Sequence, residues 1–202
     1  MKIKNIIVFA GVLAAAGLVF GCSSIKVKRT AIDKTVDLSG RWNDTDSRLV
    51  SEEMIKDCLA RPWLNDFNIK KSKVPTVIVG TIMNRSSEHI DSMLFTSDLE
   101  RSLLNSGKVK FVAMKDSRTE LREEKADQAE FSSKETAKPQ RQESGADFMV
   151  QGTINSIKDE IKGKYVMLYQ VNLEMVDLTT NEKVWIGQKE IKKVVSKSAF
   201  GL

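Results

Sequence analysis

The stretch VPTVIVGTI, from Val74 to Ile82, decides the fold. It is almost continuously apolar and rich in β-branched side chains, which is typical of a strand buried on both faces. Pro75 fits at its first residues, where the missing N–H costs least. Residues 86–108 then show helical spacing of apolar side chains, and VKFVAM, residues 109–114, follows as a second strand. Strand, helix and strand in this order predict a parallel pair with a right-handed crossover.

The helix between these strands is amphipathic. Gly107 is its expected stop, as a left-handed residue after the last turn. The side chains that we expect on its apolar side are Ile90, Met93, Leu94, Leu99, Leu103 and Leu104.

The last third of the chain alternates apolar and polar residues. The alternating segments are FMVQGTINSI (148–157), YVMLYQVNLEMVDL (165–178) and KVWIGQKEIKK (183–193). Short polar connections separate them, KDEIKGK at 158–164 and TTNEK at 179–183. Three strands with short turns predict an antiparallel meander. The predicted fold class is therefore α/β: a mixed sheet of about five strands, made of a parallel β-α-β unit and an antiparallel meander, packed with helices.

Helices are expected on both sides of this pattern. Upstream, a helix should run to about Ala60, with Asp44, Asp46 or Ser47 as its cap. Pro62 then ends it or begins a new turn. The side chains after it that look core-seeking are Trp63, Leu64 and Phe67.

A second expected helix is mostly charged and should lie on the surface. It covers residues 117–131, and Ser117 with Glu120 has the spacing of a capping box. The Ser-, Lys-, Gln- and Glu-rich residues 132–145 that follow predict a mobile loop or a frayed continuation of the helix.

The N-terminus reads as a lipoprotein leader. Lys2 and Lys4 precede IIVFAGVLAAAGLVF, residues 6–20, which is too short to span a membrane as a helix. Gly21 and Cys22 follow, as in a bacterial lipobox, where cleavage before the cysteine leaves a thiol for acylation. An uncleaved anchor helix is the alternative. Either way we expect the rest of the chain outside the cytoplasm.

The expected organisation follows from this leader. Residues 1–21 are the signal peptide, 22–38 the lipidated cysteine and a short tether, 39–195 the globular domain and 196–202 a C-terminal tail. Two or more acyl chains on Cys22 would anchor the protein stably. Ser23, rather than Asp, after the cysteine favours the outer membrane, with the domain facing the periplasm.

Composition narrows the chemistry. The formal net charge of +5 falls to +3 without Lys2 and Lys4, which does not favour nucleic acid as a partner. The single histidine, His89, and one free thiol, Cys58, cannot build a Cys/His metal cage. No carboxylate cluster has ligand spacing, and nothing local supports a Cys–His catalytic pair, although a distant pair stays open. We expect no metal, no cofactor and no enzymatic activity, a surface His89, and a buried Cys58 that shares a helix face with Val50 and Met54.

Four segments together resemble the LpoB family: SGRWNDTDSRLVSEEMI, VIVGTIMNRSSEHID, GADFMVQGTINSIKDE and YQVNLEMVDLTTNEKVWIGQKEIKK. The resemblance spans about Ser39 to Lys193. It implies an outer-membrane lipoprotein that docks on the regulatory domain of a bifunctional class A penicillin-binding protein and raises its peptidoglycan synthesis. It also implies a fold similar to the N-terminal domain of TolB.

One feature departs from enterobacterial members of the family, which carry a long Pro-rich tether. Here only about eighteen residues precede the segment RWN, and they reach about 60 Å at most. Two other roles on the same fold stay open, a secretion-channel subunit and an envelope lipoprotein that binds no synthase. The segment 132–145 is too short and polar to supply the membrane hairpin of a channel.

The candidate partner-binding residues are basic. We expect the domain to be monomeric and to meet its partner through exposed lysines. A merely solvated charged surface stays open as the alternative for each of them. These candidates are Lys158, Lys162 and Lys164 at one hairpin and Lys189, Lys192 and Lys193 on the last strand.

Overall fold

The computed structural model describes residues 27–31 and 34–196. The chain divides into two units, Met1–Lys34 and Thr35–Leu202, and the second contains the folded domain. The predicted signal peptide, Cys22 and the tail after residue 196 lie outside the described residues.

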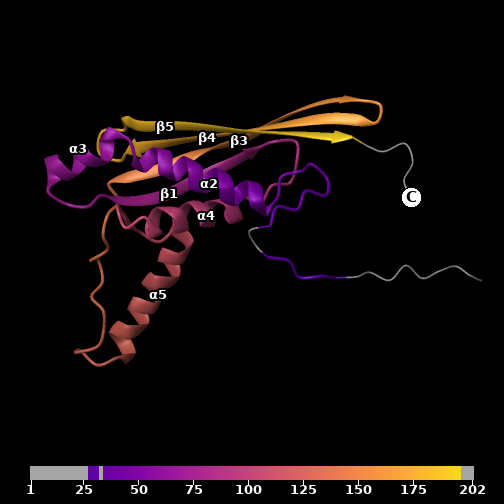
Figure 1. The fold of residues 1–202 in the computed structure, drawn as a ribbon. Helices are drawn as coiled ribbons and strands as arrows, with labels where there is room; N and C mark the ends of the chain where they lie inside the picture. Colours follow the sequence, from indigo (N-terminus) through magenta and orange to yellow (C-terminus); the bar gives the residue numbers. More distant parts are fainter. Residues whose placement is uncertain (1–26, 32–33, 197–202) are drawn as a thin grey trace, which may run out of the picture. The chain divides into compact units, whose positions relative to one another are not determined.

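The domain is built on one five-stranded sheet with the order β2-β1-β3-β4-β5 (Figure 1). Strand β1 runs parallel to both β2 and β3, whereas β3, β4 and β5 form an antiparallel meander. This confirms the predicted mixed sheet. The strands are β1 (Thr76–Arg85), β2 (Lys110–Phe111), β3 (Phe148–Ile161), β4 (Lys164–Asp177) and β5 (Lys183–Ser196).

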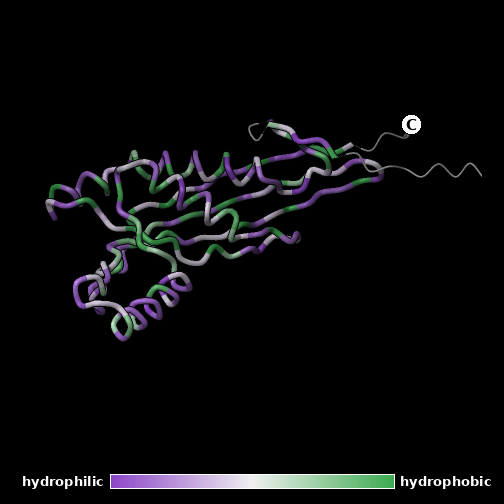
Figure 2. Tube along the Cα trace, turned by 90° about the horizontal axis from the view of Figure 1, so that it is seen from below, coloured by the Kyte–Doolittle hydropathy of each residue, from purple (hydrophilic) through white to green (hydrophobic). Residues whose placement is uncertain are grey.

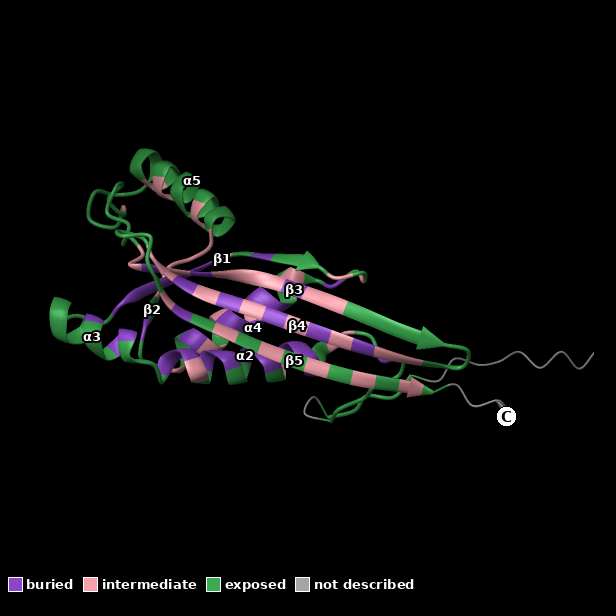
Figure 3. Cartoon of the chain, turned by 90° about the horizontal axis from the view of Figure 1, so that it is seen from above, coloured by how far each residue is buried: buried purple, intermediate pink, exposed green. Residues whose placement is uncertain are grey.

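Helices cover one face of this sheet. The helices of the described residues are α2 (Asp44–Leu59), α3 (Pro62–Lys71), α4 (Ser92–Asn105) and α5 (Lys115–Phe131). Figure 3 views the sheet from the face that α2 and α4 leave open. Helix α5 extends away from the sheet (Figure 1) and has no buried residue, as expected for a surface helix. Its charged residues appear mostly purple in Figure 2.

The helix starts differ from those predicted. Asn43 caps α2 and forms a capping box with Asp46, so none of the three proposed residues is the cap itself. Helix α4 begins only after Asp91, because the side chain of Asp91 caps it by accepting hydrogen bonds from the backbone N–H groups of Met93 and Leu94. The capping box at Ser117 is wrong, because α5 has already begun at Lys115.

The length of the second strand and the width of the apolar face of α4 were both overestimated. The second strand pairs only over Lys110–Phe111 rather than over residues 109–114. On α4, Met93, Leu94 and Leu104 are exposed, because one narrow stripe of the helix is enough to contact the sheet and α2. The buried apolar side chains of this region are Ile90, Phe95, Leu99 and Leu103.

The core lies between the sheet and helices α2 and α4. Alternate residues of β4 point into it, and they are Met167, Tyr169, Val171, Leu173 and Met175. From α2, Val50, Met54 and Cys58 meet them on one helix face, as the spacing predicted. Trp63, Leu64 and Phe67 of α3 are buried as expected, and His89 is exposed.

Cys58 should be unreactive in the native protein. Its side chain has no exposed surface, and burial raises the pKa of the thiol to about 12, so almost no thiolate forms at pH 8. A thiol reagent should therefore label Cys58 slowly until denaturant unfolds the chain. Cys58→Ala should lower the free energy of unfolding by about 1 kcal/mol, the cost of a small core truncation. Labelling in native protein as fast as in urea would contradict this.

Candidate docking surface

The meander strands continue past the helices as a three-stranded ribbon (Figure 3). We call residues 157–168 and 192–196 the distal ribbon. The predicted connection at 158–164 is mostly strand, because β3 pairs with β4 without a break to Ile161 and Lys164. The turn needs only Lys162 and Gly163, whose positive φ of 80° suits glycine. Asp159 and Glu160 suggested a loop, but Val166 and Tyr165 pair with them across the strands.

The open face of the distal ribbon carries an apolar patch. Ile157, Ile161 and Val194 are 67%, 74% and 60% exposed, and Val166 and Leu168 lie between them, half-buried. Exposed apolar side chains gathered in this way mark interaction sites more often than scattered ones do. The sequence did not predict this patch, because residues 158–164 were interpreted as a connection. In a strand that continues through this segment, Ile157 and Ile161 share one face, with Asp159 between them.

Three predicted lysines surround this patch. Lys192 pairs across the strands with Leu168, Lys164 lies opposite Ile161, and Lys162 is in the turn. All three side chains are exposed. They form the basic rim of what we call the ribbon patch, with Asp159 as a neighbouring acid.

The other three candidate lysines face the helix side of the sheet. Lys158 forms an ion pair with Glu160 and lies 5.2 Å from the centroid of the Tyr165 ring. Lys189 pairs with Glu53 of α2 at 2.6 Å. The expectation that Lys193 is exposed was wrong, because only 11% of its side chain is accessible. The structure therefore does not bring the six lysines together on one surface.

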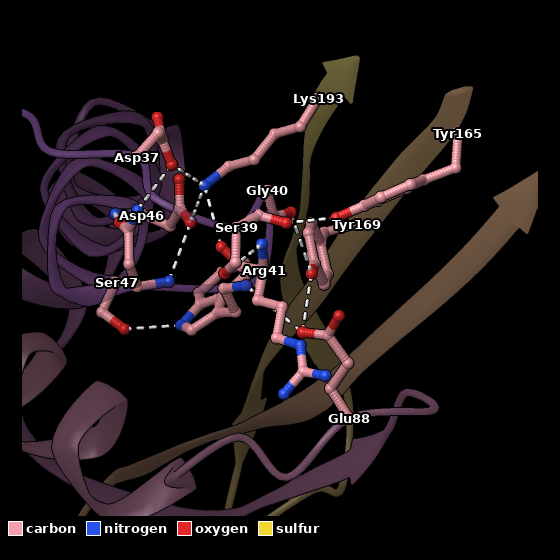
Figure 4. A network of polar contacts seen from close by, with 12 residues as sticks. Asp37, Ser39, Gly40, Arg41, Asp46, Ser47, Glu88, Tyr165, Tyr169 and Lys193 are labelled. Atoms are coloured by element: carbon pink, nitrogen blue, oxygen red, sulfur yellow. Dashed lines mark hydrogen bonds and ion pairs between the residues drawn. The ribbon is translucent and has the colours of Figure 1, made fainter. Parts of the chain in front are cut away.

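Lys193 instead binds the chain segment that precedes α2 and the first turn of α2 itself (Figure 4). Its Nζ lies 2.6 Å from Asp46 Oδ2 and 2.7 Å from Asp37 Oδ1, and it donates to the Arg41 carbonyl at 3.0 Å. Burial lowers the pKa of this amine, but the hydrogen bonds that it donates to Asp37 and Asp46 outweigh burial and raise the pKa above the usual range. Lys193 therefore stays charged at neutral pH.

Residues 37–42, which we call the strap, lie against the helix side of the distal ribbon. The Tyr165 hydroxyl donates to the Ser39 carbonyl (Figure 4). Gly40 is buried with a positive φ of 71°, and a Cβ there would overlap Val195. Trp42 packs edge-on against Tyr169, with ring centroids 5.4 Å apart. The strap thus contacts both β4 and β5.

Glu88 links the strap to the core. Its Oε2 accepts hydrogen bonds from the Tyr169 hydroxyl at 2.7 Å and from the Trp42 backbone N–H at 3.3 Å. Burial, followed by the hydrogen bond to Glu88, raises the pKa of Tyr169, so the phenol stays protonated and keeps donating. The Trp42 indole N–H in turn donates to Ser47 Oγ at 2.7 Å.

Within residues 27–31 and 34–196, no three metal-ligating side chains lie close enough to hold an ion. The described thiol, Cys58, is buried in the core. No helix among these same residues is both long and apolar enough to cross a membrane. Exposed apolar side chains also occur elsewhere on the described surface, such as Ile69 and Phe131, but those of the ribbon patch lie together beside a basic rim.

The chain was compared with curated proteins, solved structures and family models. A search of curated proteins finds no match. The C-terminal domain of LpoB from Escherichia coli is similar at 14% identity and a TM-score of 0.46, over 73% of this chain and 99% of that one. A lipoprotein from Neisseria meningitidis is similar at 12% identity and a TM-score of 0.39, over 59% of this chain and 83% of that one.

A family model decides the assignment. The model of the peptidoglycan-synthase activator LpoB matches residues 46–191, which include strands β1 to β4, helices α3 to α5, most of α2 and the first part of β5. The chain therefore belongs to the LpoB family of peptidoglycan-synthase activators.

Proposed function

We propose that this protein is an outer-membrane lipoprotein that binds a class A penicillin-binding protein and raises its peptidoglycan synthesis. Family membership supports the activating role, and the ribbon patch is the observation that carries the docking surface. The partner's regulatory domain would cover the apolar patch, with acidic groups facing Lys162, Lys164 and Lys192.

The physical properties of the ribbon patch fit this role. A few central apolar side chains usually supply most of the binding energy of an interface, while charges at its rim speed association and restrict the choice of partner. Val166 and Leu168 lie on the middle strand here, and Ile157 and Val194 are exposed apolar side chains on the strands at either side of them. Activation requires that the lipoprotein bind the active synthase more tightly than the resting one, since only differential affinity shifts that equilibrium.

The anchor completes the proposal. Residues 1–21 are removed as a signal peptide, Cys22 carries the lipid, residues 39–195 form the docking domain and residues 196–202 a tail. The lipid places the domain in the periplasm beside the outer membrane, and the domain acts as a monomer without cofactor or metal. Neither nucleic acid nor catalysis has a part in this function.

Lipidation of Cys22 can be tested directly. Wild-type protein grown with a labelled fatty acid should incorporate the label and lose its leader. Cys22→Ala should do neither, because the acceptor thiol is gone. Mass spectrometry of the mature N-terminus measures both. An unmodified Cys22 in mature wild-type protein would rule the anchor out.

Docking on the ribbon patch predicts which variants lose binding. The full chain in detergent should bind a class A synthase from its own organism and speed its consumption of lipid-linked precursor. Ile157→Asp with Val194→Asp should weaken the affinity by about tenfold or more, because charges replace two exposed apolar side chains of the patch. Lys162→Glu with Lys164→Glu should slow association and reverse its salt dependence.

Matched control variants make the same kinds of substitution at exposed residues outside the ribbon patch. Ile69→Asp with Leu121→Asp alters two exposed apolar side chains of α3 and α5, and Lys134→Glu with Lys138→Glu reverses two exposed lysines after α5. Both control pairs should bind like wild type. If they lose as much affinity as the patch variants, the docking surface is misplaced. If the wild-type chain binds no class A synthase, the role of an envelope lipoprotein without a synthase partner replaces the proposal.

A further inference from the structure

The distal ribbon has an unusual second layer. Over most of the sheet, α2 and α4 cover the inner face, but the ribbon continues beyond them (Figures 1 and 3). There the inner face is covered by the strap, which contacts Tyr165, Val195 and Lys193. These three residues belong to β4 and β5, so the strap spans two of the three strands that carry the ribbon patch on their other face.

We propose that the strap is a positioning element that holds the distal ribbon in the conformation that docks on the synthase. The inference rests on the proposed function, since it assigns the ribbon patch to docking. It makes residues 37–42, which precede the first helix of the domain, part of the binding machinery although they do not lie on the binding face.

Physical reasons favour such support. An isolated β-hairpin is marginally stable in water, and a ribbon needs a packed face to stay ordered. The strap supplies one through Trp42, Gly40 and the Ser39 carbonyl. A partner that binds one ordered ribbon conformation loses affinity in proportion to the fraction of molecules that do not adopt it.

The anchoring contacts of the strap are specific. Lys193 is held by two carboxylates and one carbonyl at 2.6–3.0 Å, and Asp46 is itself only 9% exposed. If Lys193 is removed, the carboxylates of Asp37 and Asp46 lose their buried cation, and the strap is held much more weakly against β5. Gly40 allows the strap to approach Val195, and its left-handed backbone disfavours any side chain.

Gly40→Ala tests the proposal, with Gly145→Ala as the control. Gly145 has open space around its Cβ position and no positive φ, so the same methyl group should be tolerated there. In the full chain, Gly40→Ala should raise amide hydrogen exchange across residues 157–168 by about tenfold or more. Synthase affinity should fall by about three- to tenfold as the ordered fraction drops. Exchange in β1, which the strap does not contact, should not change.

Lys193→Met gives an independent second variant that releases the strap without adding bulk beside Val195. Lys110→Met, on the opposite edge of the sheet, is its control. Lys193→Met should raise exchange over the same ribbon residues and weaken binding to a similar degree. Hydrogen exchange is measured without the synthase. It therefore reports whether the strap orders the ribbon even if no synthase binds.

The two measurements, ribbon hydrogen exchange and synthase affinity, together test the role of the strap and the proposed function separately. Faster ribbon exchange together with weaker binding supports the proposal. Unchanged ribbon exchange in both variants overturns it, as does faster exchange with wild-type affinity. If wild-type protein binds no synthase but ribbon exchange still rises, the proposed function fails, whereas the support of the ribbon by the strap stands.

Discussion

Burial of one face of the sheet is the constraint on which the rest of this structure depends. Strand β4 is central in the meander, and its inward side chains from Met167 to Met175 are buried against the helices. Because side chains alternate along a strand, the same strand must present its remaining side chains to the other face. Helices α2 and α4 cover only the inner face, so the outer face is left for water or for a partner.

This constraint also explains the fate of the basic residues on β5. Trp185, Ile191 and Lys193 share one parity and face inward, whereas Lys192 has the other parity and faces outward. Of two adjacent lysines, one is therefore enclosed by carboxylates and the other is solvated. A charge inside the inner layer is tolerated only with close partners, and Asp37 and Asp46 supply them.

Much of the fold could be predicted from periodicity. The continuous apolar run at Val74–Ile82 indicated the buried strand β1, and the alternation after Phe148 indicated the meander. That Lys193 faces inward could also have been predicted. Trp185 lies eight residues before it on the same strand, and residues an even number apart share one face. What one strand cannot reveal is the partner of such a lysine, because Asp37 and Asp46 lie about 150 residues away in the sequence. The ribbon patch was missed for a local reason: Asp159 and Glu160 have low strand propensity, and only their pairing with β4 makes them strand.

The strap also sets how far the domain can stand from its membrane. Under the proposed function, the distance from the lipid to the domain is set by the residues between Cys22 and Asp37, the first residue of the strap, and not by the distance to the first helix. A fully extended chain of about fourteen residues spans about 50 Å. Docking of the strap would then shorten the tether, and a synthase in the opposite membrane would have to present its own regulatory domain across the remaining gap.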